Sequence, residues 1–170
     1  MRTRECATLR AMETRVRSTA RALLVTPERE VLLVRFAVPA IGRHFWITPG
    51  GGIEPGETER EAAAREVAEE TGLAGAAIGP AVWTRSVPIP WMKPPYTQHE
   101  IYFWVPTPRF EPSAAGIPTD AERREIEAYR WWTLAEIDAS KERFAPRRIG
   151  ALLRDLLENG APPAPIDTEA

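Results

Sequence analysis

Short apolar segments separated by polar turns run along most of the chain and predict β-strands. Segments rich in β-branched and aromatic residues are typical of strands. Ser18–Val25 and Val31–Phe36 flank a polar turn that contains Pro27, so we expect them to form two neighbouring strands. Four further segments have the same character and are expected to be strands: Phe45–Ile47, Ala81–Val87, Ile101–Val105 and Ala128–Thr133.

Two segments carry the signals of helices. Thr58 is followed three residues later by Glu61, which is a capping box, and Gly72 suits the left-handed residue that ends a helix. The second helix is expected from about Pro146 to Asn159, because its apolar residues recur on one helical face: Ile149, Leu152, Leu153, Leu156 and Leu157. Strands and helices mixed without strict βαβ alternation predict a layered α/β or α+β fold.

The length and composition fit one domain. With 170 residues, 44% of them hydrophobic, the chain can bury a single core. Residues 1–16 lack apolar periodicity and residues 161–170 contain three prolines, so we expect a disordered leader and a flexible tail around a domain at 17–160. Met12 is an alternative start, which leaves open whether residues 1–11 belong to the native protein.

Charge and cysteine content exclude several classes of function. Lys and Arg number 22 against 24 Asp and Glu, a net charge of -2, so no positive excess draws the chain to nucleic acid or an anionic membrane. A single cysteine, Cys6, forms no internal disulfide and no thiolate zinc site, which favours a reducing compartment. We therefore expect a cytoplasmic protein with no nucleic-acid partner and no membrane partner.

The helix that begins after Thr58 carries the candidate chemistry. At about 100° per residue, Glu66, Glu69 and Glu70 fall within an arc of roughly 100°. Like charges four residues apart disfavour a helix, and Arg65 is the only local counter-charge. Hard divalent cations such as Mg²⁺ prefer carboxylate and carbonyl oxygens. The pattern therefore indicates a metal site, and a solvated glutamate-rich helix face is the alternative.

The spacing of these glutamates matches a known motif. The pattern G-x5-E-x7-R-E-U-x-E-E-x-G-U, in which U is aliphatic, is met at every fixed point by Gly51, Glu57, Arg65, Glu66, Val67, Glu69, Glu70, Gly72 and Leu73. A chance match in a chain of this length has a probability on the order of 10⁻⁶. The chain resembles the Nudix hydrolases (MutT-like). Similarity in Trp46–Gly50 and Trp131–Ile137 extends the resemblance to most of residues 18–157.

The resemblance implies a fold, a reaction and a set of site residues. The fold would be a mixed β-sheet sandwiched between α-helices, and the reaction hydrolysis of a pyrophosphate bond in a nucleoside diphosphate linked to another group. Glu66, Glu69 and Glu70, joined by the backbone carbonyl of Gly50, would hold Mg²⁺ or Mn²⁺, and Glu66 and Glu69 would take part in catalysis. The remaining motif residues would have structural roles: Gly51, Glu57, Arg65 and Gly72, with Arg65 paired to Glu57.

Residues outside the motif complete the predicted site. Nudix enzymes often use a further glutamate before the last strand as a base or an extra ligand, and Glu125 is our candidate, with Glu122 and Glu127 as alternatives. The candidates for binding substrate are Arg43, Trp46 and Glu100. Core packing is the alternative for Trp46, and Glu100 lines the cleft or faces water. Residues 85–98 are expected to form a specificity loop.

The substrate stays open. Pro88 and Pro90 straddle the position of a proline found in the ADP-ribose branch of the family, so ADP-ribose-like and dNTP-like substrates are both retained. One alternative function is hydrolysis of a non-nucleotide diphosphate. Another is a Nudix-fold sensor that binds a nucleotide without cleaving it, although such proteins usually have eroded motifs and this motif is intact. We expect a nucleotide-type small-molecule substrate and a monomer or homodimer.

Overall fold

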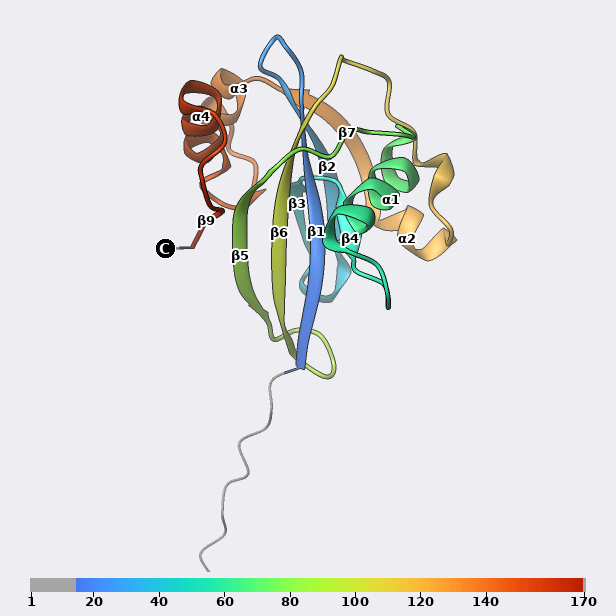
Figure 1. Cartoon of the computed structure of the whole chain (residues 1–170). Coiled ribbons are helices and arrows are strands. Elements are labelled where there is room, and N and C mark those ends of the chain that lie inside the picture. Colours follow the sequence, from blue (N-terminus) through green and yellow to red (C-terminus); the bar gives the residue numbers. More distant parts are fainter. Residues whose placement is uncertain (1–14, 170) are drawn as a thin grey trace, which may run out of the picture.

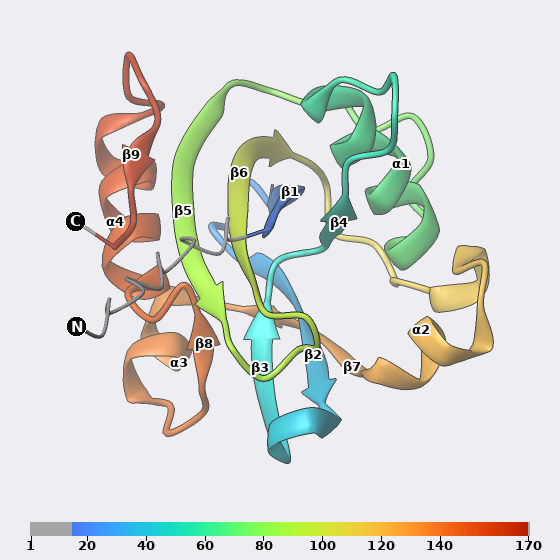
Figure 2. The same ribbon diagram turned by 90° about the horizontal axis from the view of Figure 1, so that it is seen from below.

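The computed structural model describes residues 15–169, in which one curled mixed β-sheet has helices on both faces (Figures 1 and 2). The strands are β1 (Arg15–Val25), β2 (Val31–Val38), β3 (Arg43–Ile47), β4 (Gly50–Gly52), β5 (Ala81–Ile89), β6 (Tyr96–Pro106), β7 (Ile126–Trp132), β8 (Phe144–Ala145) and β9 (Ile166–Asp167). The α-helices are α1 (Glu59–Thr71), α2 (Asp120–Glu125), α3 (Leu134–Ala139) and α4 (Ile149–Asn159), and short 3-10 helices lie at Pro39–Ile41 and Ala114–Gly116.

Strand β1 is the centre of the sheet and determines where the functional segment lies. It pairs in parallel with β6 along its whole length, but with β2 only at Val25 and Val31. Because β2 diverges from β1, the short strand β4 pairs with β1 instead, with Thr19 opposite Gly52 and Arg21 opposite Gly50. The glycine segment that precedes α1 is thereby held against the middle of the sheet.

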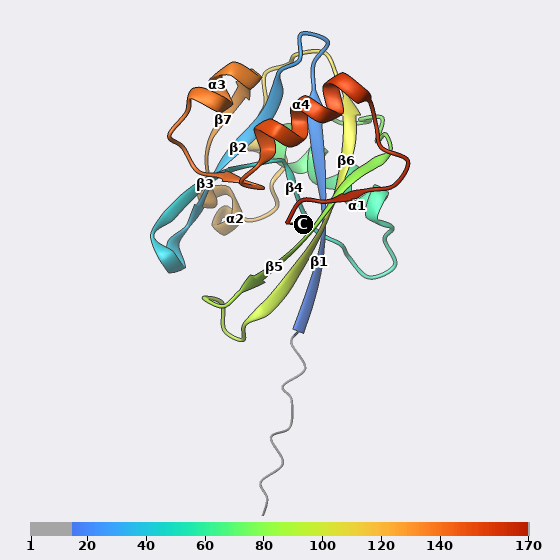
Figure 3. The same ribbon diagram turned by 90° about the vertical axis from the view of Figure 1, so that its left-hand side faces the viewer.

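The two faces of the sheet bury separate apolar clusters, because successive side chains of a strand point to opposite faces. Leu23 and Tyr102 belong to the cluster that packs against α3 and α4, and Figure 3 shows α4 lying across that face. Ala22 and Phe103, the next residues along the two strands, belong to the cluster that packs against α1, where Val67 is fully buried. None of the helices in residues 15–169 has both the length and the apolar character needed to cross a bilayer.

The predicted helix signals are confirmed at α1 and shifted at α4. The Thr58 hydroxyl accepts a hydrogen bond from the Glu61 amide, the Glu61 carboxylate accepts one from the Thr58 amide, and Gly72 ends the helix with φ +78°. Helix α4 begins at Ile149, three residues after the expected Pro146, because residues 146–148 form a turn in which the Ile149 amide donates to the Pro146 carbonyl.

The expected tail and specificity loop are both more ordered than the sequence suggested. Within the tail expected at 161–170, β9 pairs in parallel with β5, and the Thr168 amide donates to the Thr84 carbonyl. Helix α4 ends with Gly160 as its cap, and the prolines that follow do not prevent the chain from pairing with the sheet. Strands β5 and β6 occupy most of residues 85–98, so the connecting loop is confined to 90–95. Of the leader expected at 1–16, residues 15 and 16 belong to β1 and the others lie outside the described residues.

Trp46 is a core residue, which corrects its assignment to substrate binding. Its exposed fraction is 7%, and its ring packs edge-on against Trp132 with 5.1 Å between the ring centroids. Trp132 in turn contacts Phe144 in the same manner. A base cannot stack on a ring whose surface is already covered. The aromatic content of this region therefore reflects packing between β3, β7 and β8.

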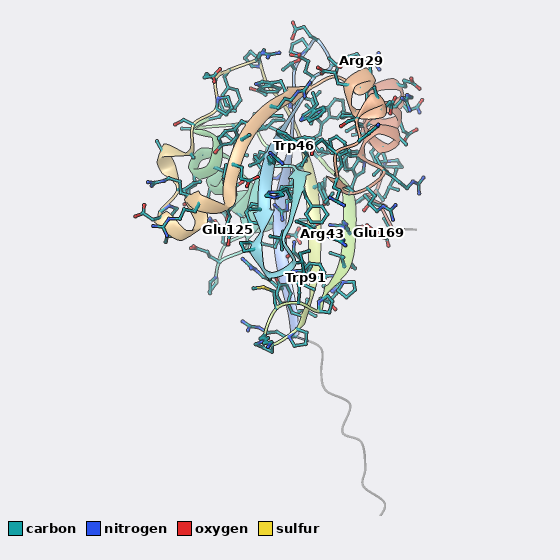
Figure 4. The ribbon with its side chains drawn as sticks, turned by 180° about the vertical axis from the view of Figure 1, so that it is seen from behind. Arg29, Arg43, Trp46, Trp91, Glu125 and Glu169 are labelled. Carbon is teal, nitrogen blue, oxygen red and sulfur yellow. The ribbon has the colours of Figure 1, made fainter. Side chains whose placement is uncertain are left out.

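Replacing Trp46 by Ala should lower the free energy of unfolding by about 3–5 kcal/mol, because a large buried ring is removed and a cavity remains. Urea unfolding followed by circular dichroism measures the loss. Trp91 is the matched control, since it lies in the loop between β5 and β6 and is partly exposed (Figure 4). Trp91→Ala should cost clearly less, and equal losses for the two variants would contradict the core assignment of Trp46.

Candidate active site

The acidic face of α1 rests on the glycine segment of β4. The Gly50 amide donates a hydrogen bond of 2.8 Å to Glu70 Oε2. The Glu66 carboxylate lies so close to Gly51 that a Cβ there would stand 2.4 Å from Glu66 Oε1. Gly50 has φ +140°, and its Cβ would stand 2.1 Å from the Ala20 carbonyl oxygen. Only glycine fits against β1 at position 50, and a side chain at position 51 would displace the Glu66 carboxylate.

Arg65 joins three of the four motif carboxylates. Its Nε and Nη2 donate to the two oxygens of Glu57 at 2.9 and 3.0 Å, which is a bidentate pair. Its Nη1 donates to Glu66 at 2.8 Å and to Glu69 at 3.2 Å. A further bond of 2.8 Å runs from Nη2 to the Gly52 carbonyl. The contact between Arg65 and Glu57 agrees with the predicted pairing, and it fixes the loop before α1 to the helix.

The carboxylates of α1 differ in their electrostatic surroundings. Burial raises the pKa of Glu70 to about 7, against the lowering effects of the Gly50 amide and of Arg21. Burial also raises the pKa of Glu66, and the bond from Arg65 offsets only part of that effect. In contrast, the hydrogen bonds from Arg65 lower the pKa of Glu57. Burial therefore disfavours the charged forms of Glu66 and Glu70, although Glu66 contacts Arg65, whereas the charged form of Glu57 is favoured.

Arg21 is a site residue that the sequence analysis missed. It lies on β1 within an otherwise apolar stretch, and its Nη1 donates to the carbonyls of Thr48 at 3.3 Å and Gly50 at 2.7 Å. One lone pair of the Gly50 carbonyl, a predicted metal ligand, is thus taken by Arg21. An arginine inside an apolar strand is the signal that could have identified it, since charges are rarely buried without a partner.

Glu100 is buried among cations and does not face water. Its side chain is 3% exposed and forms salt bridges with Arg21 at 3.2 Å and Arg85 at 3.0 Å. The Tyr102 hydroxyl donates to it at 2.6 Å and the Gln98 amide at 2.7 Å. Burial alone would raise the pKa of Glu100, but Arg21, Tyr102 and Arg85 outweigh that effect and lower the pKa to about 2. Its oxygens already accept several bonds, so a direct role in substrate binding stays only a prediction.

The other predicted substrate residues are not brought together. Arg43 begins β3 with an exposed side chain, and Trp46 lies three residues further along the same strand. Residues three apart in a strand point to opposite faces, so Arg43 and Trp46 cannot line one pocket. A substrate role for Arg43 therefore stays a prediction that concerns Arg43 alone.

The region of the expected base is a short helix and not a loop. Glu125 is the last residue of α2 and is half-buried. Figure 4 labels it at the end of α2, and Figures 1 and 2 place α2 on the same side of the sheet as α1. Glu127 lies on β7, where its Oε2 is 2.7 Å from His44 Nδ1, so it has a structural partner. The side chain of Glu122 is not among those that the structure describes.

The donor set around α1 fits a hard divalent cation chemically. Carboxylate and carbonyl oxygens are the ligands such ions prefer, and burial raises the pKa of both Glu66 and Glu70. Within residues 15–169, no three His, Cys, Asp or Glu side chains converge closely enough to form a ready metal cage. Arg65 draws Glu66 and Glu69 toward itself, whereas the Gly50 amide holds Glu70.

Replacing Arg65 by Ala should lower the free energy of unfolding by about 1–3 kcal/mol, because the Glu57 carboxylate would lose its bidentate partner in a partly buried position. Thermal and urea unfolding measure the effect. Glu59→Ala, at an exposed position in the first turn of α1, is the control for a change in this helix. An unchanged melting temperature for Arg65→Ala would contradict a structural role for the pair.

Comparisons with known proteins agree with this geometry. The family model described as NUDIX domain matches residues 15–154. The MutT protein of Methanosarcina mazei Go1 has a similar structure, with a TM-score of 0.65 and 21% identity over 87% of this chain and 97% of that chain. A C. elegans Ap4A hydrolase in a binary complex is similar, with a TM-score of 0.63 and 21% identity over 84% of this chain and 96% of that one.

A curated relative matches a short segment only. The RNA pyrophosphohydrolase of Erythrobacter litoralis (strain HTCC2594) is 64% identical over 28 residues, which are 16% of this chain and 17% of that protein. The chain therefore matches only a small part of the length of that relative. The two solved structures support the fold, and the family model spans most of the described residues. The chain belongs to the Nudix family.

Proposed function

We propose that this protein is a metal-dependent pyrophosphohydrolase that cleaves the diphosphate linkage of a nucleotide-type small molecule. The observation that carries the proposal is the set of buried carboxylates on α1, packed on a glycine segment in which the backbone of β1 leaves no room for a side chain at Gly50. Nudix hydrolases generally use a divalent metal. The intact motif favours an enzyme over a sensor that only binds nucleotide.

Glu66, Glu69 and Glu70, with the free lone pair of the Gly50 carbonyl, would hold the cation, which we take to be Mg²⁺ or Mn²⁺. Bound there, the cation would lower the pKa of a coordinated water and neutralise charge on the diphosphate. The protein's own contribution is to fix these oxygens. The Gly50 amide orients Glu70, and Arg65 keeps Glu66 and Glu69 on the same side of the helix.

The substrate class is supported by two kinds of observation. The net charge of -2 gives no general attraction for a nucleic-acid backbone, which favours a small molecule. One structural neighbour is an Ap4A hydrolase, whose name refers to a nucleotide-type small molecule, and one relative is named RNA pyrophosphohydrolase, whose name refers to pyrophosphate hydrolysis on RNA. ADP-ribose, diadenosine polyphosphates and dNTPs, ordinary and oxidised, are the first substrates to assay, with a 5′-triphosphorylated oligonucleotide and an isoprenoid diphosphate as tests of the alternatives.

Glu66→Gln and Glu70→Gln should each lower hydrolysis of the best substrate by several orders of magnitude and leave the melting temperature of the metal-free protein equal or higher. The reason is that each change removes a ligand carboxylate whose charged form is already disfavoured by burial. Steady-state kinetics with and without Mg²⁺ measure the first effect, and thermal unfolding of the metal-free protein measures the second.

Glu59→Gln is the matched control, since Glu59 is exposed on the first turn of the same helix. Its kinetics should equal those of the unaltered protein. Near-full Mg²⁺-dependent turnover by Glu70→Gln would reject the assigned site. Tight nucleotide binding without turnover on any substrate would favour the sensor, and turnover of the isoprenoid diphosphate alone would favour the non-nucleotide enzyme.

Glu125 is proposed as the general base, because carboxylates bound to a metal accept protons poorly. Glu125→Gln should lower kcat by roughly 10² to 10⁴ with KM little changed, which is the range for loss of general-base assistance. Single Gln variants at 122, 125 and 127 decide between the candidates. Glu127→Gln should keep its kcat and weaken only its contacts with His44 and Arg35. A normal Glu125 variant beside a crippled Glu122 or Glu127 variant would transfer the role.

A further inference from the structure

A continuous series of charged contacts runs from the C-terminal strand to Gly50. Arg85 Nε donates to Glu169 Oε1 at 2.8 Å, and Arg85 Nη1 donates to Glu100 Oε2 at 3.0 Å. Arg21 Nε donates to Glu100 Oε1 at 3.2 Å, and Arg21 Nη1 donates to the Gly50 carbonyl at 2.7 Å. Arg21 lies on β1, Glu100 on β6 and Arg85 on β5, and Glu169 follows β9. These four strands are consecutive in the sheet.

The network is buried except at its C-terminal end. The side chains of Arg21, Arg85 and Glu100 are 12%, 14% and 3% exposed, whereas that of Glu169 is 46% exposed. Two arginines around one buried carboxylate leave a surplus of positive charge, and Glu169 supplies the second carboxylate. Figure 4 shows Glu169 at the side of the sheet away from Glu125, where the C-terminal segment lies beside β5.

Stability alone gives little reason for such a network. Replacement of a buried ion cluster by apolar residues of similar volume is often neutral or stabilising. What apolar residues cannot supply is a directed hydrogen bond, and Arg21 directs two of them, to the carbonyls of Thr48 and Gly50. These two carbonyls flank the bend at which the chain passes from β3 into β4.

Gly50 connects Arg21 to the acidic face of α1 through two hydrogen bonds. Its carbonyl accepts from Arg21, and its own amide donates to Glu70 Oε2 at 2.8 Å. At φ +140° Gly50 has no room for a Cβ beside the backbone of Ala20 and Arg21, and the Pro49 carbonyl before it accepts from the Ala22 amide at 2.8 Å. A rotation of the Arg21 guanidinium would remove the side-chain bond that orients the Gly50 carbonyl.

We propose that Arg21, Glu100 and Arg85 are positioning residues that fix Gly50 and, through its amide, the carboxylate of Glu70, and that Glu169, two residues after the C-terminal strand β9, completes this network. The proposal rests on the proposed function only where it concerns metal binding and turnover. Its structural part concerns the metal-free protein and is tested separately.

The first test is amide hydrogen exchange of Gly50, followed by NMR in the metal-free protein. Glu100→Gln keeps the shape of the side chain but removes the charge that orients both arginines, so Gly50 should exchange faster by about threefold to hundredfold. The Trp104 amide, which donates to the Pro80 carbonyl, is the internal reference. Glu158→Gln, exposed on α4, is the control variant and should leave the Gly50 to Trp104 ratio unchanged.

The ratio of the Gly50 exchange rate to the Trp104 exchange rate distinguishes a positioning role from general destabilisation. If Glu100→Gln accelerates Gly50 and Trp104 equally, or leaves Gly50 unchanged, the proposal is overturned. Arg85→Lys, which keeps the charge but loses the fork of donors, is the second variant should Glu100→Gln fail to fold, and the same increase in the ratio is expected. Glu169→Gln should raise the ratio by about twofold to fivefold, as for a half-exposed ion pair. An unchanged ratio in Glu169→Gln would show that Glu169 does not belong to the network.

The second test is Mn²⁺ affinity measured by calorimetry. Glu100→Gln should weaken Mn²⁺ binding by about threefold to thirtyfold in the unaltered background and by less than about twofold in the Glu70→Gln background, because the network acts through Glu70. Equal losses in both backgrounds would overturn that route. If the unaltered protein binds no Mn²⁺ and hydrolyses nothing, the proposed function fails, and the Gly50 exchange ratio still decides the structural part.

Discussion

The contact between Gly50 and the backbone of β1 is the constraint on which the site depends. An acidic helix can be held this close to the centre of a sheet only if the segment between them has no side chains. At Gly50 a Cβ would stand 2.1 Å from the Ala20 carbonyl, and at Gly51 it would stand 2.4 Å from the Glu66 carboxylate. The divergence of β2 from β1 leaves the backbone of β1 available to pair with this segment.

The carboxylates of the motif lie close together and repel one another, and they differ in how many positively charged or hydrogen-bonding partners they have. Arg65 satisfies Glu57 with two bonds and shares one further nitrogen between Glu66 and Glu69. Glu70 receives only a backbone amide and the field of Arg21, and burial raises its pKa to about 7. The helix is therefore anchored at its first turns and left short of positive charge near its end. That distribution suits a site completed by a cation.

The sequence predicted what local rules determine. The capping box at Thr58, the left-handed Gly72 and the pairing of Arg65 with Glu57 depend on residues close in the chain, and each was correctly predicted. Contacts between distant segments could not be predicted. The pairing of β9 with β5 joins residues over 80 positions apart, and the prolines before it suggested a loose tail. Trp46 was misassigned because an aromatic ring serves a core and a binding surface equally well, and only burial distinguishes them.

The part of the site that the sequence analysis did not predict consists of the ion pairs that Arg21 and Arg85 form with Glu100. Neither arginine belongs to a motif, and Glu100 meets both of them only because β6 lies between β1 and β5. The register then places Glu100 opposite Thr19 on one side and Arg85 on the other, with Arg21 two residues along β1. A charged residue in the interior of a strand therefore indicates that a long-range partner exists, although the sequence pattern does not say which residue it is. In this chain the partners connect the last described residue to the glycine that holds the acidic helix.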